Sequence, residues 1–133
     1  MSEVIVYVDQ SRVLPGKLAE LKVVMQELVE FVAANEPRIL TYGVYFSPDG
    51  TRMTVLHIHS DPASLEFHMQ VGGPEFPKAA PFIELETIDV YGRPGDEIVE
   101  QLKAKAAMLG NGRVTVHEQH EGVHRLVRQH QAG

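Results

Sequence analysis

Three histidines close together in the sequence are the side chains best suited to chemistry in this chain. His57 and His59 lie in Thr54–His59, where polar and apolar residues alternate. Alternation is typical of a β-strand, so we expect both imidazoles on one face of a sheet. His68 follows in a helix that we expect to begin at Pro62. The pattern predicts a polar pocket on one side of a small sheet.

The two strand histidines fit more than one role. Imidazole titrates near neutral pH, so His57 and His59 could act as a general base or donate hydrogen bonds to a bound carbonyl or phenol. Two histidines on one strand could also direct nitrogens at a metal ion, with Asp9 or Asp89 adding oxygen ligands. A third interpretation is a structural role in a pocket wall or dimer contact. We predict catalytic roles for His57 and His59 and assign no residue to a metal site, while the metal and structural interpretations stay open as alternatives.

The composition restricts the class of protein. The chain has 133 residues, 44% of them hydrophobic and 23% charged, which is typical of one folded globular unit. It contains no cysteine, which excludes disulfides and thiolate chemistry and fits a cytoplasmic location. A net charge of −6 argues against nucleic-acid or anionic-membrane partners. The apolar run near the start is too short for a signal peptide or membrane span.

Apolar periodicity and turn residues predict the elements that must position the histidines. We expect strands over 4–9, 40–46, 52–59 and 87–91. We expect helices over 15–35 and from Pro62 onward, the second interrupted at 72–74 and resuming over 75–84. The order β-α-β-β-α-β predicts an α+β fold, a ferredoxin-like antiparallel sheet with its helices on one face.

The chain is expected to divide into a ferredoxin-like domain over 1–94 and a C-terminal extension over 95–133. In the extension we expect a helix over 97–109 and a short strand over 113–118, whereas 123–128 fits either helix or strand. Such segments should dock on the domain or on a partner subunit. We favour the partner, because a sheet edge offers unpaired backbone groups.

The two faces of the predicted sheet differ in composition. The face expected to pack on the helices carries the apolar alternates Val4, Val6, Val8, Val44, Phe46, Leu56, Ile58, Ile88 and Val90. The other face would carry Tyr7, Asp9, Thr41, Tyr45, His57, His59, Thr87, Asp89 and Tyr91. Tyrosines and histidines suit an enclosed space better than open solvent. We therefore expect a homodimer packed sheet to sheet, with a small-molecule ligand bound by Tyr7, Asp9, Tyr45, His68, Asp89 and Tyr91.

Several short motifs carry a resemblance to a known family. They are Glu36-Pro37, Tyr42, the hairpin Tyr45-Phe46-Ser47-Pro48-Asp49, the helix start from Asp61 to His68, and Phe76. On these motifs residues 3–92 resemble the dimeric α/β-barrel superfamily, in particular the antibiotic-biosynthesis-monooxygenase-like domains. Such domains often have a glutamate where this chain has His57 and an aromatic residue where it has His59.

The resemblance implies a function that the residues alone do not. Members of the superfamily include cofactor-free oxygenases, haem-degrading enzymes and isomerases. The expectation is a cofactor-independent monooxygenase or isomerase acting on an aromatic or carbonyl-bearing metabolite in a barrel pocket. The chain has no tryptophan, which argues against haem degradation. The alternative is a non-catalytic ligand-binding or dimerisation module.

Overall fold

The computed structural model describes residues 3–126. The elements follow in the order β1 (Ile5–Val13), α1 (Leu18–Asn35), β2 (Ile39–Phe46), β3 (Arg52–His59), α2 (Pro62–Gly72), the 3-10 helix η1 (Gly73–Phe82), β4 (Ile83–Tyr91), α3 (Asp96–Leu109) and β5 (Gly110–His117). Every predicted element is present, although β1, β4 and β5 are longer than expected and α1 begins later, at Leu18. Residues 123–126 have neither helix nor strand structure, and 127 and 128 lie outside the described residues.

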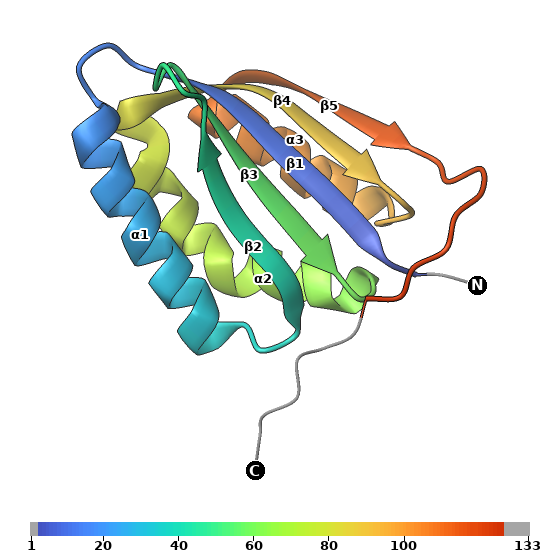
Figure 1. The fold of residues 1–133 in the computed structure, drawn as a ribbon. Helices are drawn as coiled ribbons and strands as arrows, with labels where there is room; N and C mark the ends of the chain where they lie inside the picture. Colours follow the sequence, from blue (N-terminus) through green and yellow to red (C-terminus); the bar gives the residue numbers. More distant parts are fainter. Residues whose placement is uncertain (1–2, 127–133) are drawn as a thin grey trace.

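The five strands form one sheet in the order β2-β3-β1-β4-β5. Strands β2, β3, β1 and β4 pair antiparallel with their neighbours, and β5 pairs parallel with β4. Figure 1 shows the helices on one side of this sheet, with α3 running behind β1 and β4. A parallel neighbour requires a crossover, which α3 provides. The ferredoxin-like α+β fold is confirmed, while the crossing of the last strand to a partner is not seen, because β5 extends its own sheet.

The core lies between the helices and one face of the sheet. α1 buries Leu21, Met25 and Leu28 at helical spacing, and α3 buries Ile98, Leu102, Ala106 and Leu109. They pack on Ile5, Val55, Leu85, Ile88 and Val90 of the strands. The extension therefore supplies part of the core and is not a loose appendage. No helix in the described part of the chain is long and apolar enough to cross a membrane.

The predicted assignment of the two sheet faces was wrong for β1 and β3. The helix-facing side carries Ile5, Tyr7 and Asp9 on β1 and Met53, Val55, His57 and His59 on β3, all buried. Val6 and Val8 lie opposite Ile58 and Leu56 on the uncovered face. For β2 and β4 the assignment was right, because Val44, Phe46, Ile88 and Val90 pack on the core. Alternation fixes which residues share a face, but both faces here carry apolar side chains.

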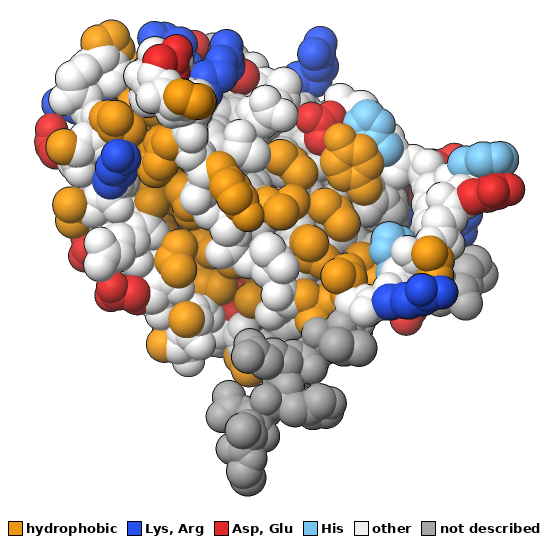
Figure 2. All heavy atoms as spheres, in the orientation of Figure 1, with side chains coloured by type: hydrophobic (Ala, Val, Ile, Leu, Met, Phe, Trp, Pro, Cys, Tyr) orange, Lys and Arg blue, Asp and Glu red, His pale blue; other side chains and the backbone are white. Residues whose placement is uncertain are grey.

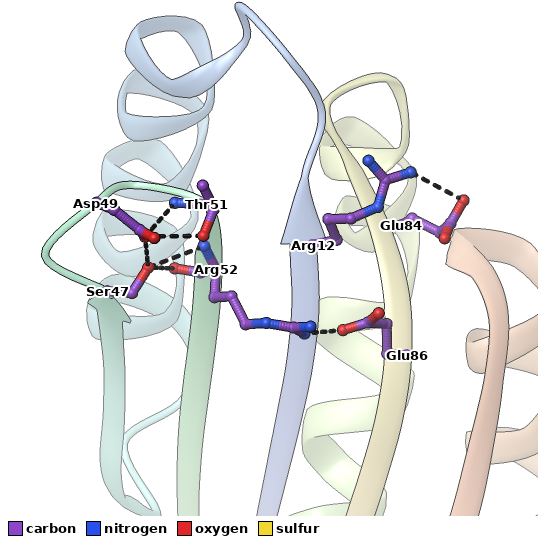
Figure 3. Close-up of polar contacts among 7 residues, drawn as sticks. All are labelled: Arg12, Ser47, Asp49, Thr51, Arg52, Glu84 and Glu86. Atoms are coloured by element: carbon purple, nitrogen blue, oxygen red, sulfur yellow. Dashed lines mark hydrogen bonds and ion pairs between the residues drawn. The ribbon is translucent and has the colours of Figure 1, made fainter.

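The hairpin between β2 and β3 sets the register of the strand that carries the histidines. Asp49 accepts hydrogen bonds from the backbone and hydroxyl of Thr51, at 3.0 and 2.7 Å, and from the Ser47 hydroxyl at 2.8 Å (Figure 3). The backbone bond from Thr51 is the main reason that the pKa of Asp49 falls to about 2. Gly50 follows with φ +73°, which favours glycine. The turn thus fixes which residues of β3 lie opposite β2.

Ion pairs beside the hairpin link the strands at this end of the sheet. Arg12 of β1 pairs with Glu84 of β4 at 3.4 Å, and Arg52 of β3 reaches across β1 to Glu86 (Figure 3). These side chains are substantially exposed, so each pair contributes little to stability.

Candidate active site

A cluster of polar and aromatic side chains is buried between the sheet and the helices. Tyr7 and Asp9 come from β1, His57 and His59 from β3, and His68 from α2; all are at most 5% exposed. The alternation of the strands places the first four side chains on one face of the sheet, and α2 brings His68 close to Tyr7, His57 and His59. The structure therefore brings together five of the eight side chains that the sequence singled out.

Asp9 is the centre of this cluster. Its Oδ2 lies 3.3 Å from Nε2 of His57 and 2.8 Å from the ammonium of Lys105, a residue of α3. Lys105 also donates to the Tyr7 hydroxyl at 2.9 Å, and its Nζ lies 4.1 Å from the centre of the Phe76 ring. Charge-assisted hydrogen bonds of this kind are stronger than neutral ones. Helix α3 thus supplies a cation to a site otherwise built by β1, β3 and α2.

The electrostatics of the cluster fix the protonation of Asp9 and His57. Burial alone would raise the pKa of Asp9, but the Lys105 ammonium and the His57 hydrogen bond outweigh it and hold the pKa well below its usual range. Burial lowers the pKa of His57 well below its ordinary value, even though Asp9 opposes the shift. Asp9 is therefore ionised and His57 uncharged at neutral pH. Nε2 of His57 must then carry the proton that faces Asp9, which leaves Nδ1 with a free lone pair.

His59 is held by the first turn of α2. Its Nδ1 lies 2.8 Å from the hydroxyl of Ser64. Ser64 is placed by the cap of the helix, because Asp61 accepts a hydrogen bond from its backbone N–H at 2.8 Å. Arg38 in turn pairs with Asp61 through two contacts of 3.0 and 3.1 Å. Burial, aided by the nearby His68, lowers the pKa of His59 to about 3, so this imidazole is also uncharged.

His68 lies one helical turn beyond Ser64 and pairs with a second carboxylate. Its Nδ1 is 2.6 Å from Oε1 of Glu36, which follows directly after α1 and is 3% exposed. Gly72 leaves room for this pair, because a Cβ there would lie 3.2 Å from Oε2 of Glu36. The Glu36-Pro37 motif thus has a specific place in the structure, as the partner of a buried histidine.

Aromatic packing keeps the imidazoles in place. The rings of Tyr7 and His57 stack with centroids 3.7 Å apart and an angle of 8°. Tyr42 meets His57 edge-on at 5.0 Å, and His68 lies 5.1 Å from His57 and 5.5 Å from His59. A side chain packed on several sides has few alternative rotamers, so its nitrogens keep fixed directions.

Several polar atoms of the cluster have no hydrogen-bond partner among the described residues. They are Oδ1 of Asp9, Oγ of Ser11, Oε2 of Glu36, Nδ1 of His57, Nε2 of His59 and Nε2 of His68. An unpartnered buried polar atom costs about 1–3 kcal/mol, so such atoms rarely gather in a site without a role. Each of the three imidazoles thus has one nitrogen bonded within the protein and one with no partner among the described residues.

Two hollows lie beside the cluster. An inner cavity of about 30 Å³ is lined by Asp9, Ser11, Tyr42, Lys105 and apolar side chains of the core. An outer groove of about 640 Å³ runs between α2 and α3 and is lined by residues that include Met69, Ile98 and Met108. Phe76 and Lys105 line both hollows. These two residues therefore lie between the groove and the inner cavity.

The remaining predicted site residues lie elsewhere. Tyr45, Asp89 and Tyr91 lie on the opposite face of the sheet, where Asp89 pairs with His117 at 2.9 Å and Tyr91 stacks on that imidazole at 4.6 Å. They cannot line the same pocket as His57, because the sheet itself separates them. The expectation that they join one site was wrong, for the same reason that the faces were misassigned.

Sequence reasoning missed Lys105, Glu36 and Ser64 as members of the site. A signal existed for Lys105: it lies seven residues after Ile98 and four before Leu109, on the apolar stripe of its helix. A lysine at a core-facing position requires a buried partner. Among the described residues, no group of three or more His, Asp or Glu side chains is placed to hold a metal ion.

Comparisons with known proteins agree with this fold. No protein-family model and no curated protein matches the sequence. Among solved structures, MupZ from Pseudomonas fluorescens matches with a TM-score of 0.73 at 19% identity, covering 94% of this chain and 91% of its own. A candidate antibiotic biosynthesis monooxygenase from Caulobacter crescentus matches with a TM-score of 0.60 at 24% identity. The match covers 67% of this chain and 88% of the Caulobacter chain. SnoaB, a cofactor-independent oxygenase from Streptomyces nogalater, matches with a TM-score of 0.59 at 15% identity. The match covers 69% of this chain and 94% of SnoaB.

The chain therefore has the antibiotic-biosynthesis-monooxygenase-like fold, which confirms the resemblance seen in its motifs. The matches to SnoaB and the Caulobacter protein span about two thirds of the chain, whereas the match to MupZ leaves out only 6% of it. So small a remainder cannot contain α3 and β5 together, so part of the extension has a counterpart in MupZ.

Proposed function

We propose that this protein is a small-molecule enzyme that removes a proton from an aromatic or carbonyl-bearing metabolite without a cofactor. The observation that carries the proposal is the Asp9–His57 pair, a buried carboxylate on one imidazole nitrogen with the other nitrogen unpartnered among the described residues. An uncharged histidine oriented by a carboxylate is a typical general base. SnoaB, which shares the fold, is a cofactor-independent oxygenase, and this chemistry suits such a base.

Three residues of the cluster and the neighbouring Tyr42 have a part in this reaction. Nδ1 of His57 accepts the proton, and Asp9 holds the tautomer and stabilises the imidazolium that forms. Nε2 of His59 orients the substrate, as expected from the sequence. Tyr42 replaces Tyr45 in the second orienting role, because it lies on the same face as His57 and contacts it. Proton removal next to a carbonyl gives an enolate, whose charge a nearby donor can stabilise.

The enolate has two outcomes. In the first, the proton is returned to a different carbon of the substrate, and the net reaction is an isomerisation. With dioxygen as co-substrate, a methylene becomes a ketone: one oxygen atom enters the product and the other leaves as water with the two methylene hydrogens. Both outcomes begin with the same proton transfer, which is the step that this proposal assigns to His57.

The size of the hollows sets how a substrate reaches the base. A cavity that holds benzene is about 150 Å³, so the inner cavity of about 30 Å³ does not admit an aromatic ring as it stands. The groove of about 640 Å³ is large enough for a metabolite of several rings. In this proposal the substrate lies along the groove and its reacting end displaces Phe76 to reach the cluster.

We further propose that the protein is a homodimer that pairs through the uncovered face of the sheet. Apolar side chains gather over the strands on this face (Figure 2), among them Val6, Val8, Leu56 and Ile58, with Tyr45 and Tyr91 56% and 45% exposed. Extended apolar patches of this kind are typical of interfaces. The dimer contact differs from the one predicted, because Tyr7 and His57 face the helices instead.

The test of the catalytic proposal is proton abstraction from an anthrone, whose methylene hydrogens are acidified by the ketone. Solvent deuterium entry and oxygen uptake are measured together, so that either outcome of the enolate is seen. We expect the wild type to catalyse exchange and His57→Gln to lose about 10²–10⁴-fold. Gln is preferred to Ala because His57 is 1% exposed and stacked on Tyr7, so truncation would leave a void. His120→Gln is the control, since that side chain is 97% exposed.

The same experiment separates the two functions. Full activity in His57→Gln would contradict the assignment of the base. Binding of the anthrone, seen as a rise in melting temperature, without exchange or oxygen uptake would favour the alternative, a ligand-binding module with no chemistry.

A further inference from the structure

Lys105 has an unusual position for a lysine. It is 6% exposed and belongs to the stripe of α3 that otherwise buries Ile98, Leu102 and Leu109. Burying an ammonium is costly, and a salt bridge at such a site seldom stabilises a fold more than apolar packing would. An apolar side chain would complete the stripe, so packing alone does not account for the lysine.

The contacts of Lys105 point to a role in the charge balance of the site. Its Nζ and Nε2 of His57 approach the same oxygen of Asp9, at 2.8 and 3.3 Å. A buried carboxylate needs a positive partner, and among the described residues two side chains, those of His57 and Lys105, hydrogen-bond to this one. If the lysine were absent, the imidazole would be the remaining group able to supply that charge. It would do so by taking up a proton at Nδ1, and so would lose the lone pair that a general base requires.

We propose that Lys105, contributed by the C-terminal extension, is a positioning residue that neutralises Asp9 so that His57 stays uncharged and keeps Nδ1 free. The inference rests on the proposed function, since it explains how the base is kept ready. Lys105 acts through Asp9 and takes no part in proton transfer itself. The lowered pKa values of Asp9 and His57, to both of which Lys105 contributes, agree with this balance.

Other charged and titratable groups also surround His57. From the elements packed around it they are Asp9 and Tyr7 of β1, Tyr42 of β2, His59 of its own strand, His68 of α2 with Glu36 behind it, and Lys105 of α3. Burial raises the pKa values of Tyr7 and Tyr42, so neither carries charge at neutral pH. Lys105 is therefore the residue of this set with a permanently charged side chain opposite Asp9, and its removal should change the charge of His57 through Asp9.

The test is nitrogen NMR of the His57 imidazole, which reports the protonation of each ring nitrogen. In the wild type at pH 7 we expect a proton on Nε2 alone. In Lys105→Met we expect protons on both nitrogens at pH 7 and a titration shifted upward by about one to three pH units. The double variant Asp9→Asn/Lys105→Met should return to the uncharged imidazole, because the anion has been removed as well. A purely structural lysine would not produce this reversal.

Lys103→Met is the matched control, because this lysine lies on the same helix, is 59% exposed and pairs with Glu100 at 3.1 Å. It should leave the His57 spectrum unchanged. An uncharged His57 in Lys105→Met, or an imidazolium at pH 7 in the wild type, would overturn the inference. The wild-type measurement can still overturn the inference even if the variants do not fold. No substrate enters the experiment, so its result is independent of whether the anthrone reaction is observed.

Discussion

The uncharged histidines of the buried cluster predict that mild acid destabilises the protein. His57 and His59 are 1% and 0% exposed, and burial is the main cause that lowers the pKa of both, that of His59 to about 3. In the unfolded chain the same imidazoles regain the ordinary value near 6.5. Below this pH the unfolded chain binds protons that the folded chain excludes, so unfolding becomes more favourable.

The size of the effect follows from linkage. Because the folded pKa values are lowered, the full stability is present above pH 6.5 and is lost as the pH falls below it. At pH 5.5 each histidine has reduced the free energy of unfolding by about 1.4 kcal/mol relative to pH 8, and the two together by about 3 kcal/mol. For a domain with a total of about 5–15 kcal/mol this is a large fraction. Free carboxylates titrate lower, so pH 5.5 mainly isolates the histidines.

The assay is urea unfolding at pH 8 and pH 5.5, at one fixed protein concentration because a dimer would make stability depend on it. We expect His59→Gln to lose about half of the pH dependence, whatever its effect on stability at pH 8. His120→Gln should keep the whole dependence, since that imidazole is exposed in both states. Equal stability of the wild type at the two pH values would show that these histidines are not buried uncharged, and would remove the basis for His57 as a base.

Two further substitutions test the assembly and the extension. Ile58→Lys places a charge on the uncovered sheet face and should convert a dimer to monomers in sedimentation at micromolar concentration. Val23→Lys, at a 58% exposed position of α1, should not; a dimer that persists in Ile58→Lys would contradict pairing through this face. Leu102→Ala should cost about 2–5 kcal/mol in urea unfolding because the side chain is 0% exposed, whereas Met108→Ala at a 46% exposed position should cost about 0.5 kcal/mol or less. Similar losses in the two variants would show that α3 does not belong to the core.

The order of elements could be predicted from the sequence because local signals were strong. Helix periodicity in α1, the Asp-Gly turn before β3 and the Asp61 cap of α2 each act over a few residues. The extra length of β1 was missed because its last residues, Ser11 to Val13, follow no apolar alternation. They are strand because they pair with β3 and β4. Pairing between distant segments is not visible in a local pattern.

Which face of the sheet meets the helices could not be predicted for the same reason. We predicted correctly from the sequence that His57 and His59 share one face. Because that face is polar, we also expected it to be the uncovered one, and it is not. The cluster is polar and nevertheless buried because its charges balance: Lys105 reaches Asp9 from 96 positions along the chain, and Glu36 reaches His68 from 32. A rule that places polar residues outside fails where polar groups bind one another.

The site therefore depends on both parts of the chain. Residues 1–94 contain the clustered histidines, Asp9 and Glu36, yet in the described part of this segment no lysine or arginine contacts Asp9. The extension adds Lys105 and one wall of the groove, through Ile98 and Met108. Cutting the chain before α3 would change the charge of the base, the shape of its access route and the packing of the core together. Substitutions in the full chain, where Lys105→Met alters the charge and Leu102→Ala the packing, are therefore the way to separate these contributions.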